Sequence, residues 1–308
     1  RLVERIKMAK LFSTITQSIA CADRVAAVMQ LDSGAHGGNK LPANGSPCGS
    51  VEFKNVSFEY ENAGAEALFD ISFFAKPGQT VGIIGGTGSG KSTLVNLVPN
   101  FYSATKGQVL IDGVNADEYD RAALLSAVSV VPQKAVLFEG TIRSNLLMGN
   151  PNASEAELFA ALETAQAAEI VRTKPNGIDE PVLRGGSNFS GGQKQRLSIA
   201  RALVHGGRIL ILDDSASALD FATDAKLRAA IRKLSPAPTT FIVSQRAASV
   251  MFADFIIVLD EGRAVGQGTH EELLRNCAVY REIYASQFPD EAAKLSIPNN
   301  IPEGDAAK

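Results

Sequence analysis

The chain alternates between short apolar runs and longer segments whose apolar residues recur at helical spacing. Residues 81–84 and 209–212 are rich in Val, Ile and Leu and are bounded by glycine or charged residues. Such runs are typical of parallel strands that are buried on both faces. Residues 51–60 instead alternate apolar and polar positions, which predicts a half-buried strand. The pattern therefore predicts an α/β protein in which buried parallel strands occur together with half-buried ones.

The same reasoning places the other elements along the chain. Residues 76–79, Lys-Pro-Gly-Gln, carry Pro and Gly at the centre of a predicted type II turn. Ser154 with Glu157, and Thr269 with Glu272, have the spacing of helix capping boxes. Further strands are predicted at 68–75, 107–113, 128–133 and 239–245, a hairpin at 254–268, helices at 121–128, 141–148, 154–170, 190–206 and 221–234, and a polar loop at 175–192.

Both ends of the chain differ in composition from its middle. Residues 1–30 keep a loose helical spacing of apolar residues among several charges. They predict either an amphipathic helix that packs on the folded domain or the cytosolic end of a helix that descends from a membrane domain. Residues 31–50, rich in Gly, Pro, Asn and Ser, predict a linker, and the folded domain is expected at 51–287. Residues 288–308 are polar and contain proline, so they predict a disordered tail.

Composition narrows the function classes. Of 308 residues, 45% are hydrophobic and 20% are charged, which suits one or two globular domains. The net charge of −3 gives no basic field that would attract nucleic acid, so no nucleic-acid partner is expected. Neither a signal peptide nor an uncharged apolar stretch of about 18 residues is visible. Cys21, Cys48 and Cys277 show neither metal-ligand spacing nor a disulfide framework, which fits a reducing compartment.

The segment that follows the strand at 81–84 carries the strongest chemical signal. It has the pattern of a phosphate loop, Gly, four residues, then Gly-Lys-Ser, between a predicted strand and a predicted helix. The glycines let backbone N–H groups close around phosphate oxygens, and the helix turns its positive N-terminal end toward the anion. Lys91 is expected to reach the β- and γ-phosphates, and the Ser92 hydroxyl is expected to ligate Mg²⁺. The expected nucleotide-binding residues are Gly85, Gly86, Thr87, Gly88, Ser89, Gly90, Lys91, Ser92 and Thr93.

Residues elsewhere add candidates for the same site. Tyr60, at the end of the first strand, is either an edge aromatic or a ring that stacks on adenine. Asp213 ends the second buried strand, where a carboxylate can lie beside the phosphate-loop serine and serve the same Mg²⁺. Gln133 also follows a strand, at the edge where open α/β sheets bind ligands. His205 is expected to lie at a helix C-terminus and His270 to be exposed, both without chemical roles.

Several motifs occur in one order along the chain. The phosphate loop is followed by Gln133, then Ser-Gly-Gly-Gln at 190–193, the strand that ends at Asp213, and Ser-Ala-Leu-Asp at 217–220. Together they resemble the nucleotide-binding domain of ABC transporters, over about residues 51–287. The segment around Gln133 is similar to that of exporters, in which the ATP-binding domain follows a six-helix membrane domain. The resemblance implies a phosphate-loop α/β core with an antiparallel β subdomain and an α-helical subdomain.

The resemblance also implies a role for each matched position. Tyr60 would stack on adenine, and the phosphate loop would hold the triphosphate of ATP. Ser92, Gln133 and Asp213 would lie around Mg²⁺. Two such domains would form a head-to-tail dimer with Asp220 at its seam. The residues that would contact the nucleotide bound by the facing domain, at a helix N-terminus suited to anions, are Ser190, Gly191, Gly192 and Gln193.

Two positions depart from the family pattern. After the strand-end aspartate the family has Glu, which polarises the attacking water, and this chain has Asp214, one methylene shorter. In a later Ser-His-Arg run the family has His, and this chain has Gln245, which carries no titratable proton. The catalytic candidates are therefore Asp214, Gln245 and Gln133. A positioned acid–base group contributes about 10²–10⁴-fold in rate, so weak hydrolysis is expected at this chain's own site, with ATP binding preserved.

These departures are the ones expected of the degenerate half of a heterodimeric exporter. The intact Ser-Gly-Gly-Gln element would complete the competent site of a facing nucleotide-binding domain. The other expected partner is the membrane domain of the full-length chain, which would place this part at the cytoplasmic face of the cell membrane. Two alternatives stay open. One is a slow homodimeric ATPase in which Asp214 serves as a weaker base, and the other is a non-hydrolytic module whose bound ATP regulates a partner.

Overall fold

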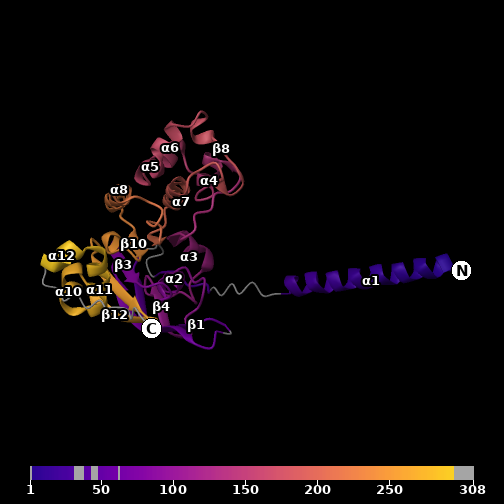
Figure 1. Ribbon diagram of the computed structural model, residues 1–308, viewed down its shortest axis with the longest axis horizontal. Coiled ribbons are helices and arrows are strands. Elements are labelled where there is room, and N and C mark those ends of the chain that lie inside the picture. The colour runs from indigo at the N-terminus through magenta and orange to yellow at the C-terminus, as the bar shows by residue number, and fades with distance from the viewer. Residues whose placement is uncertain (1, 31–37, 43–47, 62, 295–308) are drawn as a thin grey trace, which may run out of the picture. The chain divides into compact units, whose positions relative to one another are not determined.

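The computed structural model describes residues 2–30, 38–42, 48–61 and 63–294 (Figure 1). The chain divides into two compact units, residues 1–36 and residues 37–308. All strands of the described residues belong to the second unit, which therefore contains the sheets and the candidate site.

The first unit contains helix α1 (Leu2–Met29), in the place of the predicted helix. A single helix cannot bury its own apolar side chains, and Leu11, Phe12 and Ile15 of α1 are exposed. Among the described residues, no helix combines the length and the apolar content that crossing a membrane requires.

The first sheet of the second unit is antiparallel, with strand order β2-β1-β4-β5. Its strands are β1 (Val51–Glu59), β2 (Glu66–Ala75), β4 (Lys106–Ile111) and β5 (Val114–Asn115). Phe53 of β1 and Phe73 of β2 are register partners, and their rings stack with centroids 4.5 Å apart. The predicted antiparallel subdomain is therefore confirmed.

The second sheet has six strands in the order β12-β11-β3-β10-β9-β6, and β12 alone runs antiparallel to its neighbour. The strands are β3 (Thr80–Gly85), β6 (Val128–Val131), β9 (Ile209–Asp213), β10 (Thr239–Ser244), β11 (Phe255–Asp260) and β12 (Arg263–Gly268). Every residue of β3, β9 and β10 is buried, which explains their largely continuous apolar sequences. Because these strands are parallel, the residues that follow them meet at one edge of the sheet.

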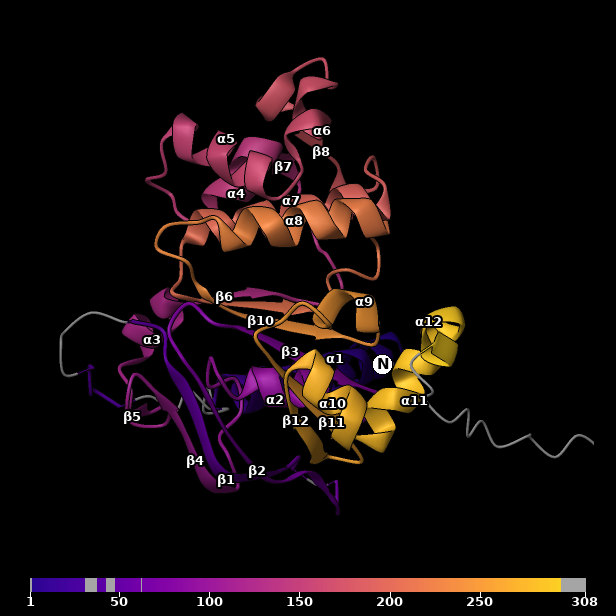
Figure 2. The same cartoon turned by 90° about the vertical axis from the view of Figure 1, so that its left-hand side faces the viewer.

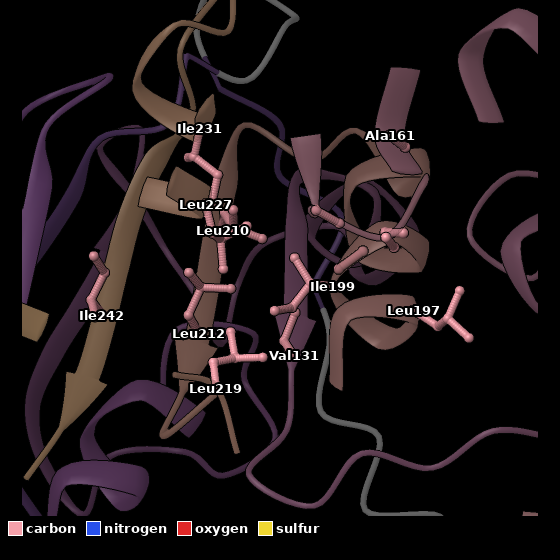
Figure 3. Close-up of a cluster of buried hydrophobic side chains, with 14 of the residues drawn as sticks. Val131, Ala161, Leu197, Ile199, Leu210, Leu212, Leu219, Leu227, Ile231 and Ile242 are labelled. Atoms are coloured by element: carbon pink, nitrogen blue, oxygen red, sulfur yellow. The ribbon is translucent and has the colours of Figure 1, made fainter. Parts of the chain in front are cut away.

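Helices cover both faces of this second sheet. They are α2 (Lys91–Asn96), α3 (Arg121–Ala127), α8 (Phe221–Arg232), α9 (Ala247–Val250), α10 (His270–Asn276) and α11 (Ala278–Gln287), and α12 (Pro289–Lys294) packs on α11. Alternate residues of β9 pack into different clusters. Leu210 packs with Leu227 of α8 on one face (Figure 3), whereas Ile211 packs with Leu94 of α2 on the other. The site edge of the sheet is therefore held between two hydrophobic clusters.

A group of helices between β6 and β9 forms the predicted α-helical subdomain, which lies beyond α8 in Figure 2. It consists of α4 (Ile142–Leu147), α5 (Glu155–Thr164), α6 (Ala168–Arg172) and α7 (Gly191–His205), the short strands β7 (Gly140–Thr141) and β8 (Pro181–Val182), and the 3₁₀ turns Gly177–Asp179 and Arg184–Gly186. The predicted capping boxes at Ser154, which begins α5, and at Thr269, which begins α10, are both present.

The single helix predicted at 154–170 is wrong. The structure has two helices there, because Gln166 adopts φ = 57° in the left-handed region. The Ala167 N–H donates to the Leu162 carbonyl oxygen at 2.7 Å, as at helix ends that terminate in this conformation. The polar loop predicted at 175–192 likewise contains β8 and the two 3₁₀ turns.

Parts of the predicted linker are attached to the folded unit. The backbone of Lys40 pairs with that of Tyr119 in an isolated parallel β-bridge. The Asp112 carboxylate accepts hydrogen bonds from three successive backbone N–H groups, those of residues 48–50, at 2.8–3.0 Å. Three such donors hold one carboxylate firmly, so the folded unit extends upstream of Val51. Residues 31–37 and 43–47 of the predicted linker lie outside the described residues.

The prediction of a disordered tail from residue 288 is wrong for its first residues, because Pro289–Lys294 form helix α12. Pro289 suits the first helical position, and Asp290 and Glu291 suit the positive N-terminal end of a helix. The Tyr284 hydroxyl of α11 also donates to the Glu291 carboxylate at 2.5 Å. Residues 295–308 of the predicted tail lie outside the described residues.

Two histidines have structural partners. His205 ends α7 as expected, but its ring contacts the carbonyl oxygens of Gly149 and Leu125, at 3.2 and 3.0 Å, in other segments. The prediction that His270 is exposed is wrong. Its Nδ1 lies 2.8 Å from the Tyr280 hydroxyl of α11, and burial lowers the pKa of His270.

Candidate functional site

The phosphate loop turns sharply from β3 into α2. A Cβ at Gly85 would lie 2.1 Å from the Leu259 carbonyl oxygen, so this position accepts no side chain. Gly90 has φ = 94°, and a Cβ there would lie 2.7 Å from a methyl group of Leu68. Gly90 is also the N-cap of α2, and no side chain of the described residues caps this helix. The N–H groups of its first turn are therefore available to an anion.

Lys91 begins α2 and is buried. Its Nζ donates to the carbonyl oxygens of Gly85, at 2.9 Å, and of Gly86. Burial lowers the pKa of Lys91, and the negative charges of Asp214 and Asp213 oppose this shift. The ammonium group is therefore held in the loop by neutral oxygens, which the oxygens of a phosphate group can replace.

Ser92 and Asp213 lie together although they are far apart in the sequence. The Ser92 hydroxyl donates to Asp213, with 3.0 Å between Oγ and Oδ1. Burial raises the pKa of Asp213, and the hydrogen bond from Ser92 opposes that shift. The strand end of β9 and the first turn of α2 thus bring the two candidate Mg²⁺ ligands into contact.

This pair of oxygen donors fits Mg²⁺. Protein sites usually bind Mg²⁺ through one or two carboxylates and substrate phosphates, while the ion keeps several waters. In the part of the chain that the structure describes, no group of three or more His, Cys, Asp and Glu residues could hold a metal ion. The donor set therefore suits a cation that binds together with nucleotide phosphates.

Gln133 and Asp214 form the next contact along this edge. Gln133 Nε2 donates to Asp214 Oδ2 at 3.3 Å. Asp214 has φ = 42°, in the left-handed region that Asp and Asn adopt more readily than most residues. The Asp214 N–H donates to the Val243 carbonyl oxygen at 3.0 Å, and the Asp214 carbonyl oxygen accepts from the Ser217 hydroxyl at 2.8 Å. The backbone that carries this carboxylate is therefore fixed on both sides.

Gln245 is the residue that follows β10 at the same edge of the sheet. The register pairs Val243 of β10 with Asp213 of β9, so Gln245 lies just beyond the strand end, as Asp214 does. Its side chain is exposed, and its carbonyl oxygen accepts a hydrogen bond from Gln287 Nε2 at 2.9 Å. Both positions that depart from the family pattern therefore lie at the edge that carries the phosphate loop.

Tyr60 borders a cleft of about 460 Å³ that the phosphate loop also lines. The Tyr60 hydroxyl lies 2.9 Å from Thr93 Oγ1, and its ring packs edge-on against Phe58 with centroids 4.7 Å apart. Glu261 and Gly262, at the turn between β11 and β12, line the same cleft. The sequence indicates this turn as a hairpin tip, but only the tertiary packing brings it beside the phosphate loop.

The Ser-Gly-Gly-Gln element opens α7 in the helical subdomain. The Gln193 N–H donates to Ser190 Oγ at 3.3 Å, and Gln193 Oε1 accepts from the Ser190 N–H at 3.0 Å. This capping box engages the Gln193 side chain at its own helix start. A Cβ at Gly192 would lie 3.0 Å from the Ala218 carbonyl oxygen. Residues 190–193 do not line the cleft beside Tyr60, so they form a separate candidate contact.

A second hollow, of about 280 Å³, lies between α8 and the beginnings of β3 and β10. Its lining is mostly apolar, with Arg228 and Arg232 beside it, and it contains none of the residues that the sequence selected. The candidate chemistry therefore belongs to the cleft at the opposite ends of these strands.

The fold and the cleft define a phosphate-loop nucleotide-binding domain in which an antiparallel sheet and a helical part flank a parallel core. The family description "ABC transporter" matches residues 68–217. The chain contains the nucleotide-binding domain of an ABC transporter.

The relatives are longer than this chain. An uncharacterized ABC transporter ATP-binding protein of Mycobacterium tuberculosis is 43% identical over 293 residues, which cover 92% of this chain and 50% of that protein. An ATP-dependent lipid A-core flippase of Burkholderia orbicola is 42% identical over 245 residues, covering 80% of this chain and 41% of the flippase. The structure of a bacterial Atm1-family ABC exporter with ATP bound matches with a TM-score of 0.81 and 34% identity, over 90% of this chain and 48% of the exporter. The chain thus spans about half the length of these relatives.

Proposed function

We propose that this chain is the ATP-binding part of an ABC exporter whose own nucleotide site binds Mg·ATP but hydrolyses it weakly. A contrast within one site carries the proposal. The hydrogen bond between Ser92 and Asp213 holds the two candidate Mg²⁺ ligands side by side at the phosphate loop. At the same sheet edge, Asp214 and Gln245 stand where the family has Glu and His. The first feature favours ATP affinity, and the second disfavours turnover.

Binding would be divided among several groups. Residues 85–93 would offer backbone N–H groups to the triphosphate, and Lys91 would exchange its carbonyl partners for phosphate oxygens in stronger, charge-assisted bonds. The Tyr60 ring would stack on adenine. Ser92, Asp213 and Gln133 would hold the cation and its waters. When bound, Mg²⁺ supplies charge neutralisation at the phosphates.

Turnover would be limited by the two altered positions. A general base must reach the attacking water, and Asp214 carries its carboxylate one methylene closer to the backbone than Glu would. The Gln245 amide can donate and accept hydrogen bonds but cannot take up a proton at neutral pH. A missing acid–base group removes about 10²–10⁴-fold in rate, which corresponds to about 3–5 kcal/mol of barrier.

The second candidate contact supports a nucleotide-binding partner. Ser190, Gly191 and Gly192 would meet the γ-phosphate of ATP held by a facing domain, at the N-terminus of the 15-residue helix α7. Because this element is intact, the chain would complete a competent site while its own site mostly retains ATP. In a heterodimer, with Asp220 at its seam, one site would hydrolyse ATP with the help of this element and the other would retain ATP.

A membrane domain is the other proposed partner, because exporters and flippases of about twice this length are among the relatives. Residues 1–30 would be the end of its last helix, and the folded unit that contains residues 51–287 would be the nucleotide-binding domain at the cytoplasmic face of the membrane. Another hollow, also of about 280 Å³ but different from the one beside α8, is lined by the exposed Phe101, Phe138 and Met148. Exposed apolar side chains around a hollow favour a site at which a partner docks.

Comparing ATP hydrolysis by the natural chain and by Asp214→Asn, over a range of chain concentrations, tests this proposal. We expect equally low rates, since the carboxylate at 214 contributes little. Hydrolysis clearly above background that Asp214→Asn abolishes would instead favour the homodimer alternative, in which Asp214 is the working base. Complete absence of hydrolysis, also in the presence of a partner domain with Glu and His at these positions, would favour the regulatory module.

A further inference from the structure

Arg246 connects the segment that follows β10 to the loop that follows Asp214, at the site edge of the sheet. Its Nη1 donates to the carbonyl oxygens of Ala216 and Leu219, both at 3.3 Å, and its Nη2 donates to the Ser217 carbonyl oxygen at 3.1 Å. Its guanidinium also lies over the Phe221 ring, 5.5 Å from the centroid. A planar guanidinium with donors in a fixed fork suits three carbonyl oxygens of one loop better than a lysine ammonium does.

The segment that Arg246 contacts, here termed the 215–220 loop, lies between the nucleotide edge and the helical subdomain. It begins directly after Asp214, and it ends at Asp220, which caps α8 by accepting from the Thr223 N–H at 2.8 Å. The loop also packs closely against the start of α7, where a Cβ on Gly192 would approach the Ala218 carbonyl oxygen to 3.0 Å. A displacement of the loop would therefore change its contact with the Ser-Gly-Gly-Gln element.

The backbone that carries Arg246 is held on both sides. Gln287 of α11 donates from Nε2 to the Gln245 carbonyl oxygen at 2.9 Å, and its Oε1 accepts from the Ala247 N–H at 2.8 Å. The Arg246 N–H itself donates to Ser244 Oγ at 3.0 Å. Residues 244–247 are thus braced as one piece, and a shift at Gln245 carries the Arg246 side chain with it.

We propose that Arg246 is a positioning residue that couples ATP occupancy at this chain's own site, sensed at Gln245, to the 215–220 loop and so to the element that contacts the partner's nucleotide. The inference rests on the proposed function, since it assumes that ATP bound at the phosphate loop reaches Gln245. Through this coupling, a site that retains ATP without hydrolysing it would still control the arrangement that completes the partner's site.

Hydrogen–deuterium exchange of the full chain, with and without Mg²⁺ and the non-hydrolysable analogue AMP-PNP, tests this coupling. In the natural chain we expect the nucleotide to slow exchange both at residues 86–93 and in the 215–220 loop. In Arg246→Ala we expect unchanged protection at 86–93 and unchanged nucleotide affinity, with loss of the nucleotide response in the loop. Arg246→Lys, which keeps the charge but not the fork, should retain part of the response.

Arg275→Ala is the matched control, because it removes an exposed arginine from α10, outside the site, and should keep both responses. A merely structural role for Arg246 would raise loop exchange equally with and without nucleotide, which would overturn the coupling. An intact loop response in Arg246→Ala, or no loop response in the natural chain, would do the same. Absence of protection at 86–93 in the natural chain would overturn the proposed function and the coupling together. If Arg246→Ala does not fold, Arg246→Lys carries the test.

Discussion

Replacing Asp214 by Glu and Gln245 by His is expected to convert a nucleotide-retaining site into a hydrolysing one. Glu restores the reach of the carboxylate, and His restores a side chain that can exchange a proton near neutral pH. The Ser92–Asp213 contact and the phosphate loop are unchanged in this double variant. ATP affinity is therefore expected to stay close to that of the natural chain.

The size of the gain follows from two opposing effects. Even the lower end of an acid–base contribution, about 10²-fold, corresponds to about 2.7 kcal/mol of barrier. Residue 214 has φ = 42°, a conformation that Glu adopts less readily than Asp. This strain costs about 1 kcal/mol. If all of that strain opposed catalysis, about 1.7 kcal/mol would be left, so turnover should rise at least about tenfold.

The assay is steady-state phosphate release at saturating Mg·ATP, at chain concentrations high enough for two domains to meet. Adding Lys91→Ala to the double variant is the control, since it removes the phosphate-binding ammonium and should return the rate to background. Equal rates for the natural chain and the double variant, with both binding ATP, would refute the assignment of positions 214 and 245 as the limiting ones.

Further predictions concern binding and stability. Tyr60→Ala should weaken ATP binding about two- to thirteenfold in fluorescence titrations, because a stacked ring contributes about 0.5–1.5 kcal/mol, whereas Tyr60→Phe should not; equal losses would argue against stacking. Gly90→Ala should lower the free energy of unfolding in urea by about 1–3 kcal/mol, since φ is 94° and the new Cβ would lie 2.7 Å from a methyl group. Gly64→Ala, at φ = 69° in open space, should cost less, and an equal cost would mean that the close contact carries no penalty. Burial lowers the pKa of His270 below its unfolded value of about 6.5, so the unfolded chain binds the extra proton. Stability should therefore fall as the pH drops through about 6.5, more in the natural chain than in His270→Gln, and identical pH slopes would contradict this.

The parallel core and the phosphate loop could be predicted because their signals are local. Strands buried on both faces require continuous apolar runs, as in β3 and β9. Two glycines of the loop are required by the structure: Gly85 by a close backbone contact, and Gly90 by a close contact together with a positive φ. The capping box at Ser154 likewise involves residues only three apart.

Other features depend on contacts between distant segments, which a single sequence does not reveal. The break between α5 and α6 requires a positive φ at Gln166, a residue without a strong preference for it. His270 is half-buried because the Tyr280 side chain of a later helix packs beside it. The approach of Gly262 to the phosphate loop and the hold of Gln287 on residue 245 arise from tertiary packing.

The measurement that tests the central claim most directly is Mg·ATP turnover determined together with ATP affinity on the purified chain. A site that keeps Lys91, Ser92 and Asp213 but has Asp214 and Gln245 should bind ATP tightly and turn it over at a rate close to background. Ready turnover that rises with the square of the chain concentration would contradict this account. It would mean that Asp214 suffices as the base and that two copies of this chain form the working unit.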